Sequence, residues 1–460
     1  MSDWKKLNQL CTKITDGSHF SPVGVESGYP MLSVKDMKEN GFDYSNCKYI
    51  NVDDYKSLLR NDCKPLKNDV LIAKDGSYLK HVFVIENERE DAILSSIGIL
   101  RPNLKLIDPY YIKYYLDSDF VKREVAKKYV SGSALPRIIL KNFGEILVPY
   151  IEKSKQTSIV NVLKSIDSKI ALNNRINAEL EAMAKTVYDY WFVQFDFPFP
   201  STSSGTGYNN APGYKSSGGK MVWSEELKRE VPEGWDVKHL EKIISKIIDN
   251  RGKTPLKLGG DWSKSREGVI ALSAKHVKGG KLLKLNEANV VTYEMFEKWM
   301  PNKLQEGDIL MTSEAPCGEF YLILNDTNYC LSQRLFAMRA DKSEVLSTYL
   351  YFELSKGNGY SQILGKQSGS TVFGIRQEEL RTVNILKPDM AVQKLFEEKV
   401  LPMLNQIRNN EFQNQYLSSL RDWLLPMLMN GQVVSATLNN RESTTLNNRE
   451  EEWLDEKHLI

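Results

Sequence analysis

The feature that most constrains the fold of this chain is that its two halves resemble each other. Segments recur in the same order at a spacing of roughly 240 residues, which is far longer than the unit of a solenoid and indicates a duplicated domain. The matches pair residues 4–10 with 235–240, 31–35 with 271–275, 67–72 with 306–311, 93–96 with 330–333 and 131–133 with 368–370. We therefore expect two related domains in one chain.

Each half is followed by a long helical pattern. Apolar residues step by three or four positions, interrupted by a polar break near Asn173 in the first stretch. Each stretch covers about ten turns, or on the order of 50 Å, which is more than a domain of this size covers. A single such stripe usually packs on its own domain, but the repeated position favours two helices that pair as a coiled coil. The stripe residues are Ile159, Leu163, Ile166, Ile170, Ile176, Leu180, Met183 and Val187, then Val400, Leu404, Ile407, Leu417, Leu420, Leu424 and Met427.

These patterns predict an α+β chain: two duplicated α/β domains separated by two long antiparallel coiled-coil helices. The sequence of 460 residues also exceeds what one hydrophobic core supports. Strands are expected at residues 70–73, 82–85, 309–312 and 321–324, and Trp4 and Trp235 are expected to anchor the cores. The predicted parts are domain 1 (1–150), helix 1 (151–195), a flexible Ser- and Gly-rich linker (196–225), domain 2 (226–388), helix 2 (389–430) and a polar tail (431–460).

Composition excludes several classes of protein. The start lacks the apolar region of a signal peptide and no apolar run could span a bilayer, so we expect a cytoplasmic protein. The five cysteines are scattered, which indicates neither a disulfide framework nor a zinc site. The net charge is only +2, so any nucleic-acid-binding face has to be local.

Catalytic motifs are not recognisable either. There is no Walker-type phosphate loop and no Asn/Asp-Pro-Pro-aromatic motif of an amino-methyltransferase. Asp389, Glu397 and Lys399 have the spacing of a nuclease metal site, but they lie at the start of the second helical stretch, where surface charge is the simpler interpretation. We expect no catalytic residue and no metal site in this chain.

Two strings complete a family resemblance. INAELEAMAKTVYDYWFVQFD at residues 176–196 and VWSEELKREVPEGW at residues 222–235, together with the duplicated architecture, resemble the specificity (S) subunit of type I restriction-modification systems over residues 1–430. The resemblance implies a pseudo-twofold molecule whose domains each read one half of a bipartite, asymmetric site in double-stranded DNA. The helices would set the spacing of the two halves.

The resemblance also implies partners that carry the chemistry. Two methyltransferase (M) subunits would dock on the helices and methylate adenine at N6 with S-adenosylmethionine. Restriction (R) motor-nuclease subunits, where present, would use ATP and Mg²⁺. The chain itself would hold no cofactor. The alternative is a non-catalytic scaffold whose duplicated domains bind proteins, and salt-dependent DNA affinity separates the two hypotheses.

Base readout requires hydrogen-bonding side chains on loops, with cations nearby for phosphates. We chose such residues at matching places in both halves, although an ordinary loop or helix-cap residue is the competing interpretation for each one. In domain 1 they are Thr15, Asp16, Ser18, His19, Lys35, Lys74, Ser77, Ser131, Ser133 and Arg137. In domain 2 they are Asn250, Arg251, Lys253, Thr254, Lys275, His276, Ser313, Gln333, Arg334, Ser368 and Ser370.

Aromatic residues on the two helical stretches are the candidates for the partner interface, because aromatic side chains often anchor interfaces. The competing interpretation is that they close the helix pair onto a recognition domain. The candidates are Tyr188, Tyr190, Trp191 and Phe192 at the end of the first helix and Trp423 on the second.

Overall fold

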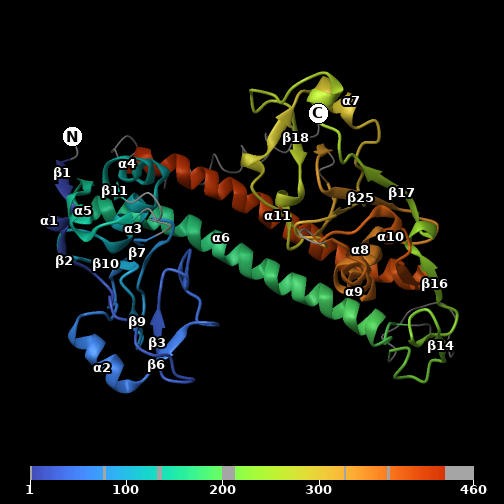
Figure 1. Ribbon diagram of the computed structural model, residues 1–460, viewed down its shortest axis with the longest axis horizontal. Helices are drawn as coiled ribbons and strands as arrows, with labels where there is room; N and C mark the ends of the chain where they lie inside the picture. The colour runs from blue at the N-terminus through green and yellow to red at the C-terminus, as the bar shows by residue number, and fades with distance from the viewer. Residues whose placement is uncertain are drawn as a thin grey trace. The chain divides into compact units, whose positions relative to one another are not determined.

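A computed structural model describes residues 3–75, 79–131, 137–198, 213–325, 328–369 and 373–429. The chain forms two compact units. Unit 1 comprises Met1–Asn173 and Phe412–Ile460, and unit 2 comprises Asn174–Glu411. Figure 1 labels the elements of both units.

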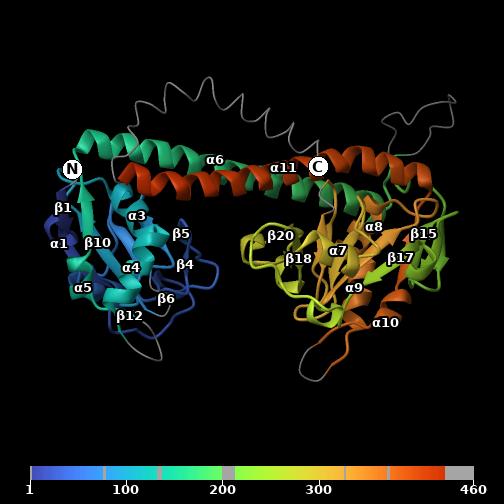
Figure 2. The same ribbon diagram turned by 90° about the horizontal axis from the view of Figure 1, so that it is seen from above.

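Unit 1 is built around an antiparallel sheet in the order β2-β10-β7-β8 (Cys11–Asp16, Ile97–Pro102, Val70–Ala73, Val82–Val84). All four residues of β7 are buried, as expected for an inner strand of apolar side chains. Helix α3 (Pro109–Asp117), which Figure 2 labels, packs against β7 and β8 and starts with Asp108 as N-cap and proline at its first position. A second sheet has the order β6-β3-β9 (Lys48–Ile50, Tyr29–Leu32, Ala92–Ile93).

The remaining elements of unit 1 are short. They are β1 (Asp3–Lys6) paired with β13 (Leu147–Tyr150), β4 (Met37–Lys38) with β5 (Gly41–Phe42), β11 (Val130–Ser131) with β12 (Arg137–Ile138), and helices α1 (Leu7–Leu10), α2 (Val52–Arg60), α4 (Asp119–Tyr129) and α5 (Leu140–Glu145).

Unit 2 repeats this topology. Its main sheet has the order β17-β25-β22-β23 (Ile244–Asp249, Leu335–Ala340, Ile309–Thr312, Phe320–Leu322) and its second sheet β21-β18-β24 (Asn289–Val291, Val269–Leu272, Tyr329–Leu331). The other elements are the pairs β16 (Asp236–His239) with β26 (Asn384–Lys387), β14 (Met221–Ser224) with β15 (Arg229–Pro232) and β19 (Val277–Lys278) with β20 (Lys281–Leu282), and helices α7 (Tyr293–Trp299), α8 (Ser347–Lys356), α9 (Asn358–Gly365) and α10 (Gln377–Arg381).

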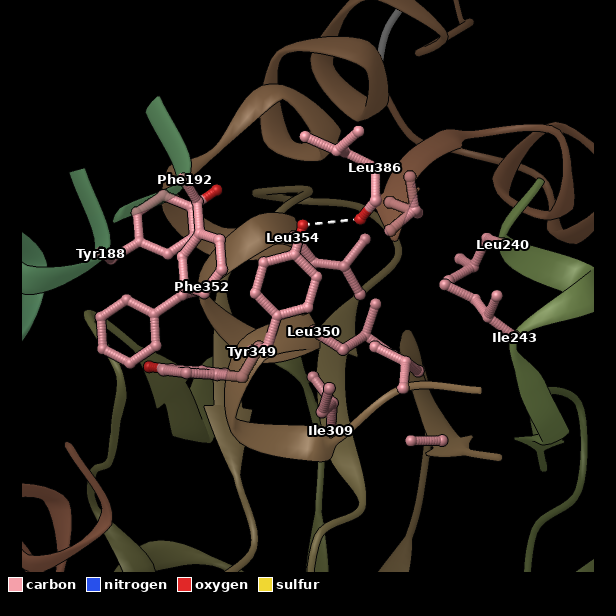
Figure 3. Packing of buried hydrophobic residues seen from close by; sticks show 14 of the residues in the cluster. Tyr188, Phe192, Leu240, Ile243, Ile309, Tyr349, Leu350, Phe352, Leu354 and Leu386 are labelled. Carbon is pink, nitrogen blue, oxygen red and sulfur yellow. Dashed lines mark hydrogen bonds between the residues drawn. The ribbon is translucent and has the colours of Figure 1, made fainter. Parts of the chain in front are cut away.

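Individual contacts repeat as well. The Tyr111 hydroxyl donates to the carbonyl of Pro149 at 2.9 Å in unit 1, and the Tyr349 hydroxyl donates to the carbonyl of Leu386 at 2.6 Å in unit 2 (Figure 3). The duplication predicted from the sequence is thereby confirmed at the level of single hydrogen bonds.

The two long helices are α6 (Lys153–Tyr188), which continues into a π-helical turn at Asp189–Val193, and α11 (Met390–Met429). Within unit 1 they run antiparallel, because Arg421 Nη1 lies 2.9 Å from Asp167 Oδ1 and Asn173 Nδ2 donates to Asn414 Oδ1 at 2.9 Å. The polar break at Asn173 is therefore a buried amide contact between the helices.

Three expectations need correction. Trp4 is 48% exposed, because Leu7 and Leu10 fill the core in its place, whereas Trp235 is buried as predicted. The linker predicted at 196–225 includes ordered packing, since Phe197 stacks on Trp235 with ring centroids 4.8 Å apart and residues 221–224 form β14. The strand expected at 321–324 is β23, shifted to Phe320–Leu322. The tail at 431–460 lies outside the described residues, and no helix among the described residues has the length and apolarity to cross a membrane.

The core of unit 2 contains a carboxyl group, which makes its stability depend on pH. Glu353 is buried, accepts the Tyr188 hydroxyl and the Gly359 N–H, and has a pKa raised by burial. The native chain keeps this proton to a higher pH than the unfolded chain, where a glutamate has a pKa of about 4.3. The free energy of unfolding should therefore fall as pH rises from about 4.3 through the folded-state pKa.

We expect Glu353→Gln to remove that part of the pH dependence, because glutamine keeps an acceptor but does not titrate. Urea unfolding of both proteins at a series of pH values between 4 and 7 measures the effect. An equally steep fall in both proteins would contradict the assignment.

Candidate nucleic-acid interface

One end of the main sheet of unit 2 gathers the loops predicted to read DNA. Strands β17 and β22 end there and β25 begins there, since Asp249 pairs with Phe336 and Thr312 pairs with Leu335. Strand β18 ends at the same place, because the Ser332 N–H donates to the carbonyl of its last residue, Leu272, at 2.8 Å. We call this the loop end of unit 2; it comprises residues 250–254, 273–276, 313–318, 332–334, 368–369 and 373–376.

Backbone hydrogen bonds join these loops. The Ser313 N–H donates to the Arg334 carbonyl at 2.9 Å, and the Ile375 N–H donates to the Ser313 carbonyl at 2.9 Å. Ser368 and Gly374 exchange backbone hydrogen bonds of 2.8 and 3.1 Å, which close the last loop. The side chains on the loop end therefore project from one connected backbone platform.

The two predicted arginines of this end have different surroundings. Arg251 reaches back to Asp249 through Nε at 3.0 Å and Nη2 at 2.8 Å, and its guanidinium lies over the Phe336 ring at 4.2 Å from the centroid. Arg334 is paired with Glu314, with 3.0 Å between Nε and Oε1, and its side chain is 51% exposed. Arg251 is thus engaged within the unit, which does not support the prediction that it reads bases.

Several residues predicted to contact DNA are buried in unit 2. The His276 ring accepts the Ser273 N–H at its Nδ1, and burial lowers the pKa of His276 to about 4, so the ring is neutral at pH 7 and offers no charge to a phosphate. Asn250 is 5% exposed, and Ser313 is 1% exposed with no hydrogen-bond partner for its hydroxyl among the described residues. These three serve the interior of the loop end, contrary to the prediction.

The remaining predictions of unit 2 have accessible side chains. Gln333, Arg334, Lys275 and Ser368 are exposed, and Lys253 and Thr254 are half-buried; Ser370 lies outside the described residues.

The main sheet of unit 1 has an equivalent loop end. The Lys74 N–H donates to the Ser96 carbonyl at 2.9 Å and the Ile138 N–H donates to the Lys74 carbonyl at 3.2 Å, as Ser313 and Ile375 do in unit 2. The Ser18 carbonyl accepts the Ser95 N–H at 2.9 Å. We call residues 16–20, 33–35, 74–75 and 94–96 the loop end of unit 1.

Burial corrects the predictions here too. Lys74 and Asp16 are each 8% exposed and form an ion pair with each other, so neither charge is presented to solvent. Ser18 is also buried, and its hydroxyl donates to the Phe20 carbonyl at 2.6 Å. A lysine in a strand-end pattern gives no sign of a carboxylate far away in the sequence, which is why the sequence suggested a free cation.

Other predictions of unit 1 have accessible side chains or lie outside the description. His19 and Lys35 are exposed, and Thr15 is half-buried. Ser77 and Ser133 lie outside the described residues, and only the backbone of Ser131 and Arg137 is described.

Sequence reasoning missed three residues at these ends, of which two are exposed and Glu314 is half-buried. Phe20 is 67% exposed, Phe373 is 61% exposed, and Glu314 pairs with Arg334. Glu314 directly follows the predicted strand 309–312 and Ser313, so its position was accessible from the pattern. Its pairing with Arg334 could not be predicted from the pattern, because the two residues meet only through strand pairing.

The aromatic residues predicted for the partner interface divide into two groups. Tyr188, Trp191 and Phe192 are at most 5% exposed and pack in the core of unit 2, where Figure 3 shows Tyr188 and Phe192 beside Tyr349 and Phe352. For these three the competing interpretation holds: they close the helix onto the domain. Tyr190 and Trp423, by contrast, are 44% and 63% exposed.

The nuclease interpretation finds no support in the described residues. Glu397 accepts the Thr348 hydroxyl at 2.7 Å on α11, and no cluster of three or more histidine, cysteine or acidic side chains suited to a metal occurs in the described part of the chain.

Known proteins share this arrangement. The family model of the type I restriction modification DNA specificity domain matches residues 1–182 and 232–418. The chain is 23% identical over 487 residues to the specificity subunit of type I restriction enzyme HindI from Haemophilus influenzae, across 94% of this chain and 100% of that one. It is 23% identical over 443 residues to the putative type I restriction enzyme MjaX specificity subunit from Methanocaldococcus jannaschii, across 94% of each.

A solved structure, the S subunit of a type I restriction-modification system from M. genitalium, matches with a TM-score of 0.53 and 14% identity, across 93% of this chain and 96% of that one. At this identity the match concerns the fold.

Proposed function

Since this chain belongs to the family of type I restriction-modification DNA specificity subunits, we propose that its two units each read one half of a bipartite, asymmetric site in double-stranded DNA. The observation that carries the proposal is the pair of equivalent loop ends, which combine the same backbone hydrogen bonds with different exposed side chains. A shared platform with different side chains suits two readers of unlike sequences, because bases are distinguished by hydrogen-bond pattern in the major groove.

In this proposal the chemistry belongs to partner subunits. Two M subunits would bring S-adenosylmethionine and methylate adenine at N6, docking on α6 and α11, which would also set the spacing of the half-sites. R subunits would supply ATP- and Mg²⁺-dependent cleavage, and the complex would work in the cytoplasm. The exposed Tyr190 and Trp423 remain our candidates for the M-subunit contact. The chain itself would contribute sequence choice, which is differential binding.

The experiment is to express the chain with its methyltransferase in a host without adenine methylation and to map methyladenine by long-read sequencing. We expect one split motif. Lys253→Ala should weaken recognition of one half of the split motif only, which assigns that half to unit 2. The matched control is Lys228→Ala, since Lys228 pairs with Glu225 in the β14–β15 turn, away from the loop end.

A stable complex without methylation, together with DNA affinity that does not depend on salt, would contradict the proposal and favour the protein scaffold. Phosphate contacts release counterions, so a DNA reader loses affinity steeply as salt rises.

A further inference from the structure

The loop end of unit 2 presents two exposed guanidinium groups without a hydrogen-bond acceptor for Nη1 or Nη2 among the described residues, those of Arg334 and Arg376, and of these two only Arg334 is paired with a carboxylate. Arg334 forms an ion pair with Glu314, with 3.0 Å between Nε and Oε1, and among the described residues no acceptor takes a hydrogen bond from its Nη1 or Nη2. A guanidinium carries five N–H donors in a rigid plane, so a carboxylate near Nε leaves the Nη1–Nη2 edge available to another acceptor. That edge is a two-donor surface.

Arg251 shows that an open edge is not a general property of this loop end. Arg251 lies nearby, because its guanidinium covers the ring of Phe336, two residues after Arg334 in the sequence. Arg251, however, uses both Nε and Nη2 on the two oxygens of Asp249. Of these neighbouring arginines, only Arg334 is arranged for a new bidentate contact.

The backbone under Arg334 is held in place. Its φ is 65°, in the left-handed region, and its carbonyl accepts the Ser313 N–H. The neighbouring Ser332 and Leu335 are 8% and 0% exposed. A side chain that starts from a fixed backbone and is paired with a carboxylate loses less conformational freedom on binding, which is the condition for precise readout.

The position that matches Arg334 differs in unit 1. There the equivalent backbone hydrogen bond is accepted by Ser96, whose hydroxyl accepts the Val34 N–H at 3.1 Å. Lys74, whose backbone belongs to the same platform, is neutralised by Asp16. The arginine at this place is therefore a difference between the two loop ends.

We propose that Arg334, positioned by Glu314, reads a guanine by donating from Nη1 and Nη2 to O6 and N7 in the major groove. The half-site of unit 2 then contains a G·C pair at this position. A bidentate arginine is the commonest specific contact to guanine and discriminates against other bases by about 5- to 150-fold. This inference rests on the proposed DNA-reading function and adds the identity of one base and its reader.

The test uses the full chain with its methyltransferase and the same methylation map. Wild type should require G at one position of the half assigned to unit 2 by Lys253→Ala. Arg334→Gln should relax that position alone, by about 5- to 150-fold in the preference for G. Arg334→Lys, which keeps the charge but loses the planar fork, should relax it as well. Lys228→Ala, in the β14–β15 turn away from the loop end, is the control and should leave every base of the motif unchanged.

Glu314 acts by positioning Arg334. Its variant therefore has to be distinguished from one that merely destabilises the fold. Glu314→Gln should weaken the preference for G at the same position less than Arg334→Gln does, with the same thermal unfolding midpoint as wild type. If wild type methylates a split motif without a required G in the half of unit 2, or if Arg334→Gln leaves that G required, the inference is wrong while the proposed function stands. If wild type produces no split motif, the proposed function itself fails.

Discussion

Phe192→Ala should destabilise unit 2 by about 3–5 kcal/mol, the range for truncating a buried aromatic side chain. Phe192 is 2% exposed, and its ring centroid lies 4.6 Å from that of Tyr349 and 5.0 Å from that of Phe396. The substitution would open a cavity where the end of α6 meets α8 and α11. Thermal or urea unfolding of the purified chain measures the loss.

The neighbouring residue supplies the control. Tyr190 is 44% exposed, so Tyr190→Ala should change stability by no more than about 0.5 kcal/mol. The pair of variants also separates the two interpretations of this aromatic segment. A Phe192→Ala protein that keeps its stability but loses the methyltransferase would mean that Phe192 is an interface residue after all.

Asp308→Ala should cost about 3–5 kcal/mol, because it breaks a buried ion pair and strands its partners. Asp308 is fully buried and accepts Arg339 Nε and Nη2, each at 2.8 Å, and the Gln305 N–H at 2.8 Å. Without the carboxylate, the guanidinium of Arg339 loses both charge-assisted hydrogen bonds and keeps only the one to the Lys303 carbonyl at 2.8 Å.

The duplication provides an internal replicate of this experiment. Asp69 in unit 1 accepts Arg101 Nε at 2.9 Å and Nη2 at 3.0 Å, with the Leu66 N–H at 2.8 Å, so Asp69→Ala should produce a comparable loss in unit 1. Glu225→Ala, which removes a partner of the exposed Lys228, should have no measurable effect on urea unfolding. Equal stability of Asp308→Ala and wild type would show that the ion pair contributes nothing net.

The sequence predicted best those features that repeat locally. The helices expected at 151–195 and 389–430 correspond to α6 and α11 because a stripe of apolar residues at helical spacing is visible within one window. Strands β7 and β22 match the expected residues because each is a short apolar run bounded by turn residues.

Prediction was poorer wherever the outcome depended on residues distant in the sequence. Lys74 was expected to face DNA and is neutralised by Asp16, and His276 was expected to be available and is a buried cap. Tyr188 was expected to point outward and donates to Glu353 in the core. In each case the sequence shows that the side chain has a polar group. Whether the side chain is exposed depends on strand pairing or on the packing of α6 on α8, which no local pattern displays.

The hydrogen bonds that join the loop ends are made by backbone groups, which any residue other than proline can supply, while the exposed side chains take no part in them. Changes in the side chains therefore leave the framework of Asp69 with Arg101, and of Asp308 with Arg339, untouched. Lineages of such a protein can change what they recognise in small steps without first losing a foldable chain. Exposed residues of the two halves can then differ while each half keeps the same framework.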